Sequence, residues 1–306
     1  MGFGFLTGLG VVLAPVGPAS RPATRPAGKT VPFQPGIQVD WGRRQIEIDS
    51  TVVLREGLLE LFACSPGTRE HESILRVNCR PLYIYQALRL IGLTPGTPPA
   101  WDEKANKPIP PTGDRVDAFV RYRTGGKTKQ VRAWDWMTGG EKALCPRSWV
   151  FAGSFRTEDG GLAADGEGTV LTVVDFADAL LALAESHSAD NAQLWVAART
   201  EQIPALGTSC TLVLRPARTV VRRITLDRLG RLTLVGKTVS QTQLREFLMA
   251  DLEADREPLI ELRVEGDVAS SSLERTVVWL KEIGIGPEAI CVKRNGPEAG
   301  GGRREP

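Results

Sequence analysis

The spacing of apolar residues changes near residue 220, and this change is the strongest constraint on what the chain can fold into. Before it, short segments such as 45–49 alternate between apolar and polar residues with a period of two, which indicates strands with one buried face. After it, two segments repeat apolar residues at helical spacing between alternating segments. The sequence therefore predicts an α+β protein whose two parts bury separate cores.

The first part, residues 37–217, is predicted to be a β-rich, mainly antiparallel α+β domain. Alternation on both sides of Gly125 and Gly126 predicts a hairpin. Pro81 begins a segment with apolar residues at a spacing of three, which predicts a helix ending at Gly92. The proline-rich residues 94–114 are expected to form a loop without regular structure, and residues 176–183 a short helix.

The second part, residues 220–295, is predicted to be a small ββαβαβ two-layer sandwich. Ser240 with Gln243 predicts a capping box at the first helix, and Ser271 with Glu274 predicts a cap at the second. About 75 residues lie close to the lower size at which one core suffices. We therefore expect an exposed strand edge of this part to pair with another copy.

The amino terminus is apolar from Phe3 to Leu13 and is broken at Pro15. This length suits a secretory signal and falls short of the roughly 20 residues that span a bilayer, although no basic segment precedes it. We expect residues 1–20 to be a signal peptide or N-terminal anchor, and the protein to be periplasmic or otherwise extracytoplasmic. Residues 21–36 are expected to be a Pro-rich linker, and residues 296–306 a disordered tail.

The composition excludes several classes of function. A net charge of +2 over 306 residues is not the concentrated basic field of a nucleic-acid binder. Two histidines rule out a multi-histidine metal site, and the five cysteines lack C-x-x-C spacing. Cys210 and Cys291 lie in apolar strand patterns and are expected to be small core residues. No cofactor is expected.

The stretch LFACSPGTREHES places Cys64, His71 and Glu72 around a turn. In a catalytic interpretation, Cys64 is a nucleophile, His71 its base, and Glu72 orients the imidazole. In a metal interpretation, Cys64, His71 and Cys79 are ligands, with Glu72 as the fourth. Two further interpretations are a structural turn in which His71 and Glu72 hydrogen-bond the next strand, and a Cys64–Cys79 disulfide. The structural turn is favoured, so no enzyme is expected, and the alternatives stay open.

Two other features invite a binding interpretation. Indole rings close in the sequence could line a cleft for a sugar or peptide, or else lie in the core: Trp134, Trp136 and Trp149. The glycine-rich residues 159–168 carry Asp159, Asp165 and Glu167 and could bind calcium weakly, although a solvated loop is favoured.

Segments of the first part occur in a characteristic order: VLREGLLELFAC, REHESIL, ALRLIGLTPG, WVFAGS and IPALGTSCTLVLRP. Between about residues 39 and 216 the chain thereby resembles the YdjY-like domain found in exported bacterial proteins, especially those of planctomycete type. This resemblance implies no established activity.

The second part contains DRLGRLTLVGKTVSQTQL, followed by PLIELRVEGDVASSSLERTVVWLKEIGI. These segments resemble the extracytoplasmic domain of the ExbD/TolR family of proton-driven, energy-transducing complexes. That family carries a transmembrane helix with an acidic residue directly before this domain, a place taken here by the first part. The resemblance therefore implies a dimerising or envelope-binding module and no proton coupling.

Together these observations predict an exported, non-enzymatic envelope protein in which a binding or scaffold domain is fused to an interaction module. Its expected partners are another copy or an envelope protein, through the second part, with peptidoglycan or a membrane complex as a further contact. The alternatives are a Cys/His-centred metalloprotein or hydrolase, and an accessory component of an ExbD/TolR-type transport system.

Overall fold

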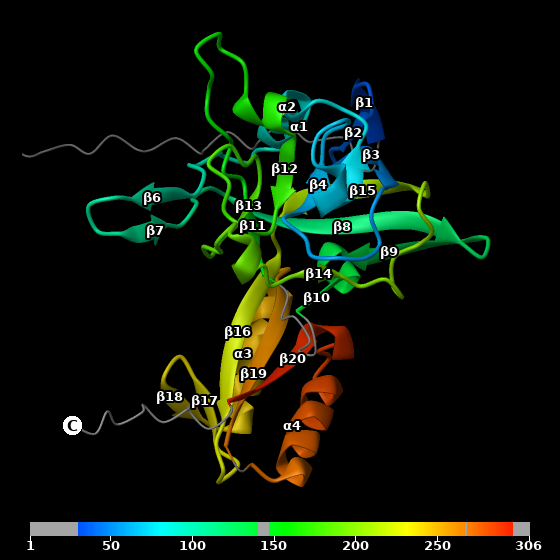
Figure 1. Ribbon diagram of the computed structural model, residues 1–306. Coiled ribbons are helices and arrows are strands. Elements are labelled where there is room, and N and C mark those ends of the chain that lie inside the picture. The colour runs from blue at the N-terminus through cyan, green and yellow to red at the C-terminus, as the bar shows by residue number, and fades with distance from the viewer. Residues whose placement is uncertain (1–29, 140–146, 267, 296–306) are drawn as a thin grey trace, which may run out of the picture.

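A computed structural model describes residues 30–139, 147–266 and 268–295, which form two units with separate hydrophobic cores (Figure 1). The first core draws on residues 37–214 and the second on residues 224–285. We call residues 30–217 the first unit and residues 218–295 the second unit. The protein is α+β, with more strand than helix. The expected signal segment and the expected tail lie outside the described residues.

The first unit is built on an eleven-stranded sheet that nearly closes on itself. The path of neighbouring strands runs through β12 (Thr169–Thr172), β4 (Leu61–Cys64), β5 (Ser73–Val77), β3 (Gln45–Val52), β15 (Ser209–Pro216), β8 (Arg115–Thr124), β11 (Trp149–Val150) and β13 (Ala182–Leu183). The two ends of this path meet, because the amide of Thr172 donates to the carbonyl of Leu181 at 2.9 Å. Closure removes most of the exposed strand edges that an open sheet would leave.

The remaining elements of the first unit extend this sheet, lie against it or form small separate sheets. β9 (Lys127–Arg132) pairs with β8, which confirms the predicted hairpin, and β10 (Met137–Thr138) pairs with β14 (Ala197–Ala198). The predicted helix is α1 (Pro81–Leu90), which lies beside α2 (Ala163–Glu167). β1 (Thr30–Gln34) pairs with β2 (Ile37–Asp40), so part of residues 21–36, where only a linker was expected, forms a strand.

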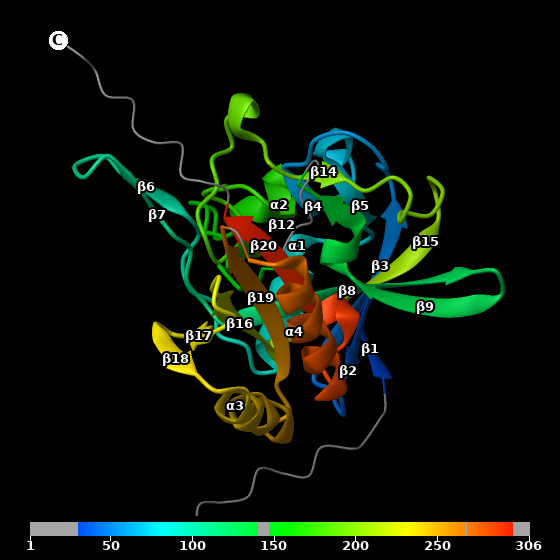
Figure 2. The ribbon, with the colours of Figure 1, turned by 90° about the horizontal axis from the view of Figure 1, so that it is seen from below.

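Residues 94–114 are not the irregular loop that their proline content indicated. They form a hairpin of β6 (Ala100–Asp102) and β7 (Lys107–Ile109) that projects from the first unit (Figures 1 and 2). The carboxylate of Asp102 accepts hydrogen bonds from the amides of Lys104 and Ala105, each at 3.0 Å, and closes the turn. Proline is tolerated because a two-stranded hairpin leaves half of its amides unpaired.

Residues 176–183 form a turn and the strand β13 rather than the predicted helix. The amides of Leu180 and Leu181 donate to carbonyls of β12, at 2.9 and 3.0 Å, and β13 pairs with β11. Closure of the sheet thus overrides the weak local preference of an apolar run for helix.

The second unit contains a five-stranded sheet with the order β18-β17-β16-β19-β20. Its elements are β16 (Thr219–Leu226), β17 (Leu232–Leu234), β18 (Lys237–Val239), α3 (Gln241–Glu253), β19 (Glu257–Glu265), α4 (Ser270–Glu282) and β20 (Ile290–Asn295), so one short strand is added to the expected order. β16, β19 and β20 are parallel, and parallel crossovers are right-handed, so α3 and α4 cover the same face. Leu244, Leu248 and Leu280 of these helices join the second core.

The helix caps of the second unit were predicted with mixed success. The capping box of Ser240 and Gln243 is present at α3. The cap predicted at Ser271 is wrong, because α4 begins at Ser270 after Ala269, which provides no side-chain cap.

None of the described helices combines the length and the hydrophobicity that a membrane span requires.

The projecting hairpin is anchored by close backbone packing at Gly113. Its φ is +129°, and a Cβ placed there would lie 2.1 Å from the carbonyl oxygen of Phe151. We expect Gly113→Ala to lower the free energy of unfolding by about 2 kcal/mol or more, because strain and steric overlap add. Urea denaturation measures this loss.

Gly126→Ala is the matched control, because Gly126 also has a positive φ, +75°, but has no atom within 4 Å of the added Cβ. We expect it to cost only about 1 kcal/mol. Equal losses in the two variants would show that backbone packing at Gly113 does not hold the hairpin.

Candidate functional site

The structure separates Cys64 from His71. The Cys64 thiol lies at the end of β4 with no exposed surface, near the hydroxyls of Ser73 and Thr68, and burial raises its pKa. The His71 side chain is 74% exposed, and its ring contacts the Glu72 carboxylate at 3.4 Å. A nucleophilic cysteine needs a lowered thiol pKa and a nearby base, and Cys64 has neither among its described contacts.

Glu72 belongs instead to a charged cluster that ties the start of β4 to the following 3-10 turn (Glu70–Glu72). The carboxylates of Glu60 and Glu72 interact. The pKa of Glu60 is raised, mainly by burial and then by the neighbouring Glu72 carboxylate. Arg69 contacts Glu60 at 3.3 Å and Glu72 at 3.6 Å, and its guanidinium lies over the ring of Phe176. The stretch thus has a structural role, but the expected side-chain hydrogen bonds from His71 and Glu72 to the next strand are not found among the described residues.

The metal interpretation also fails in its geometry. Among the residues that the structure describes, no three His, Cys, Asp or Glu side chains are grouped so that they could hold a metal ion. This covers the set of Cys64, His71 and Cys79, and the calcium candidates Asp159, Asp165 and Glu167. Cys64 and Cys79 are both free thiols, so the alternative of a disulfide between them is wrong.

Two of the acidic residues have structural partners. Asp165 accepts hydrogen bonds from Arg80 at 2.6 Å and from the amide of Leu82 at 2.8 Å, and thereby fixes the start of α1. Asp159 interacts with Thr157 and with the amide of Gly161 within its own turn.

The three tryptophans lie in the first core rather than in a cleft. Trp134, Trp136 and Trp149 are at most 6% exposed. Trp134 stacks on Trp149 with ring centroids 4.9 Å apart, and Trp136 packs on Tyr122. A sugar or peptide needs an exposed ring face, and these rings offer none.

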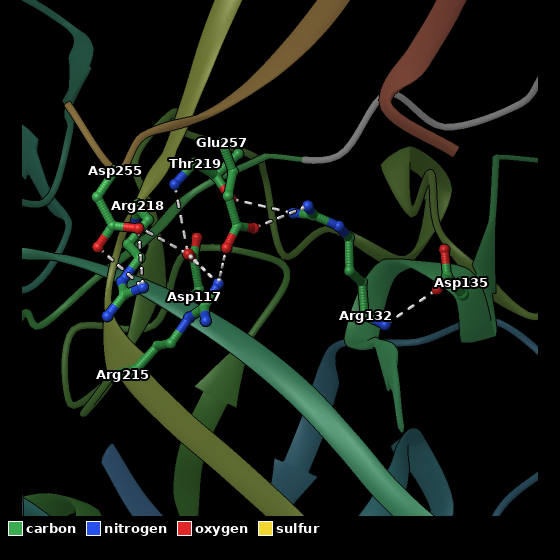
Figure 3. A network of polar contacts seen from close by, with 8 residues as sticks. All are labelled: Asp117, Arg132, Asp135, Arg215, Arg218, Thr219, Asp255 and Glu257. Atoms are coloured by element: carbon green, nitrogen blue, oxygen red, sulfur yellow. Dashed lines mark hydrogen bonds and ion pairs between the residues drawn. The ribbon is translucent and has the colours of Figure 1, made fainter. Parts of the chain in front are cut away.

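The most concentrated polar chemistry lies where the two units join (Figure 3). Asp117 of β8 is only 8% exposed, and its carboxylate accepts hydrogen bonds from the amides of Arg218 and Thr219, at 3.0 and 3.4 Å. The guanidinium of Arg215, at the end of β15, lies 3.6 Å from the same carboxylate. The first unit therefore holds the backbone at the start of β16 directly.

A second carboxylate, Glu257 at the start of β19, completes the connection from the other side. It pairs with Arg215 and with Arg132 of β9, the latter at 3.1 Å, while Arg132 also donates to the hydroxyl of Thr219 at 3.0 Å (Figure 3). We call Asp117, Glu257, Arg132 and Arg215 the junction clamp. The buried charge of Asp117 is stable only when it is paired, and the partly exposed Glu257 adds further ion pairs, so the clamp holds the two units together.

Beside the clamp lies a cleft of about 440 Å³ lined by both units. The charged residues of its lining are mostly basic: Arg115, Arg147, Glu185, Arg222, Arg223, Glu261, Arg263 and Lys293. Arg222 is turned away, because its guanidinium binds the buried carboxylate of Asp251 on α3 through two contacts of 2.7 Å. Of the other five cations, four pair with the carboxylates of Glu185 and Glu261, and Arg115 has no ion pair among the described residues.

Arg147, which lines the cleft from the first unit, belongs to an aromatic and cationic stack behind it. The guanidinium of Arg147 lies 4.7 Å from the ring centre of Trp195, on which His187 is stacked at 4.3 Å. The pKa of His187 is lowered to about 4, mainly by burial and then by the charge of Arg147. The ring is therefore neutral at pH 7. Burial also lowers the pKa of Arg147, and the nearby Arg223 adds to this effect.

This cleft was not predicted from the sequence, although one signal was present. The segment RPARTVVRR, residues 215–223, places four arginines in nine positions. The carboxylates that bind these arginines lie far away in the sequence, so local spacing does not show where the side chains gather.

The two units and their clamped junction define a two-core α+β protein with a nearly closed β-sheet in its larger unit. The YdjY domain model matches residues 37–215, more than half of the chain, so the chain belongs to the YdjY domain family. This confirms the resemblance seen in the first part of the sequence. No curated protein and no solved structure matches the chain.

The clamp predicts a protease-sensitive junction when its central carboxylate is removed. We expect Asp117→Ala to speed trypsin cleavage after Arg218 about tenfold or more, because the amides of Arg218 and Thr219 lose their acceptor and breaking a buried ion pair costs about 3 kcal/mol. Timed digestion with mass analysis of the fragments measures this rate.

Asp227→Ala is the control, because Asp227 pairs with Arg231 inside a turn of the second unit, away from the junction. It should leave the rate of cleavage after Arg218 unchanged. An unchanged rate in Asp117→Ala would mean that the clamp does not hold the junction.

Proposed function

We propose that this chain is an exported, envelope-associated binding or scaffold protein without enzymatic activity. In it, the YdjY domain carries a second unit that acts as an ExbD/TolR-like interaction module. The observation that carries this proposal is the junction clamp, which leaves only Ala217 between β15 and the first residues bound by Asp117. Such a short, ion-paired connection suits a protein that presents one module in a fixed position relative to another.

The interaction module is proposed to act through the edge of its sheet. β20 is the last strand in the sheet order, and its Val292 is 38% exposed. An edge strand presents unpaired backbone groups that can pair with a strand of another molecule. We propose that a second copy of this chain pairs there, with an envelope protein or a membrane-bound transport complex as the alternative partner.

Export is supported by the state of the cysteines. Cys291 of β20 is disulfide-bonded, whereas Cys64, Cys79 and Cys210 are free and buried. Disulfides persist in oxidising compartments and are rare in the cytosol. Cys291 is therefore more than the small core residue that its strand pattern indicated.

Self-association through β20 is tested by light scattering of the full chain at about 100 µM, a concentration at which weak dimers form. We expect a dimer, and we expect Val292→Lys to reduce it to a monomer, because a lysine on an edge strand opposes pairing. Val278→Lys, on the exposed surface of α4, is the matched control and should remain dimeric. A monomeric wild-type chain, or equal effects of the two lysines, would contradict pairing through β20.

The redox state is tested by differential alkylation of protein isolated from its native cells. The denatured chain is alkylated before reduction and with a second reagent after reduction, and the cysteine peptides are identified by mass spectrometry. We expect the peptides of Cys64, Cys79 and Cys210 to carry the first reagent and that of Cys291 the second. First-reagent labelling of Cys291 would remove the support that this bond gives to export.

A further inference from the structure

We propose that the cleft between the two units binds a small ligand that carries at least two oxyanion groups, phosphate or carboxylate. This inference rests on the proposed binding function and names the chemistry of its ligand. It does not depend on export or on self-association.

The charge of the cleft lining is the first argument. Arg147 and Arg223 contact Glu185, and Glu261 is shared by Arg223 at 3.7 Å, Arg263 at 2.7 Å and Lys293 at 3.6 Å. Arg115 has no ion pair or side-chain hydrogen bond with the described residues. Five cations facing two carboxylates leave an excess of positive charge in a concave space, where the field is focused.

The geometry of the second unit explains why these charges face the cleft. Ile260, Leu262 and Val264 of β19 point to the helices and belong to the second core. Glu261 and Arg263, between them in sequence, therefore point to the opposite face. Lys293 of β20 lies opposite Arg263 in the parallel register, and Arg223 of β16 lies opposite Glu261, so one face of three strands carries this charge.

Ser148 supplies an independent indication of a ligand. It lines the cleft beside Arg147, is only 6% exposed, and its hydroxyl has no hydrogen-bond partner in the part of the chain that the structure describes. A buried hydroxyl without a partner is destabilising, and an oxyanion oxygen within reach would accept a hydrogen bond from it. Apart from Glu185 and Glu261, the charged side chains of the cleft are hydrogen-bond donors, as a carboxylate or phosphate requires.

The size and composition of the cleft set the class of ligand. A volume of about 440 Å³ suits a molecule of metabolite size. Guanidinium groups bind phosphate and carboxylate oxygens in pairs, so several arginines from both sides favour more than one oxyanion group. The described lining contains no aromatic residue, and Trp195, which Arg147 contacts, is already covered by Arg147 and His187, so charge rather than stacking is expected to govern recognition.

The experiment is isothermal titration calorimetry of the full chain with inorganic pyrophosphate and, separately, with citrate. We expect at least one of them to bind with 1:1 stoichiometry, with an affinity that falls as salt concentration rises. Tighter binding of pyrophosphate identifies a phosphate-bearing ligand, and tighter binding of citrate a carboxylate-bearing one. The absence of binding of either probe at millimolar concentration would overturn the proposal.

Charge-neutralising variants locate the site. Arg263→Gln with Lys293→Gln should weaken binding at least about tenfold, and Arg115→Gln, which breaks no ion pair, about threefold. The matched control is Arg245→Gln with Arg294→Gln, which removes the same charge from exposed positions outside the cleft lining and should change the affinity less than about twofold. Thermal denaturation confirms that each variant is folded. Equal weakening by the cleft and control pairs would show non-specific charge attraction and overturn the site, whatever the outcome of the light-scattering test of β20.

Discussion

The carboxylate of Asp117 is the group on which the arrangement of this protein depends. It lies almost buried on β8 and accepts the amides of the first two residues of the second unit. A charge with so little exposure is stable only if it is fully partnered, and its partners here are backbone groups that cannot move away. The direction of β16 is therefore fixed by the closed sheet of the first unit, and the rest of the small sheet follows from β16.

The position of the cleft follows from this constraint and from the handedness of the chain. Right-handed crossovers place α3 and α4 on one face of the small sheet. The other face keeps the polar members of the alternation in β19, Glu261 and Arg263. Because β16 leaves the first unit beside Arg147 and Ser148, this polar face and the wall of the first unit enclose the same space. The cleft is thus a product of topology, and no single local motif encodes it.

The parts that could be predicted from the sequence are those that depend on neighbouring residues. The hairpin of β8 and β9, the helix after Pro81 and the capping box of Ser240 and Gln243 each follow from local spacing and are present. The clamp could not be predicted, because Asp117 and Arg218 are 101 positions apart and Arg132 and Glu257 are 125 apart. Cys64 and His71 show the opposite case, because residues that are close in the sequence do not meet in the structure. The strand buries the thiol, while the turn directs the imidazole to solvent.

The proposed anion binding in the cleft implies reversible association. The cations of the cleft are already partly neutralised by Glu185 and Glu261. An entering anion would compete with these carboxylates, so its binding free energy would be only the difference between the ion pairs formed and the ion pairs weakened. Arg147 belongs to the first unit and Arg223 to the second, and a shared anion would add a bridge across the junction that the clamp already closes. By linkage, a ligand that contacts both units would favour the clamped arrangement by the same factor by which that arrangement favours the ligand, although the clamp and the cleft use different ionic contacts.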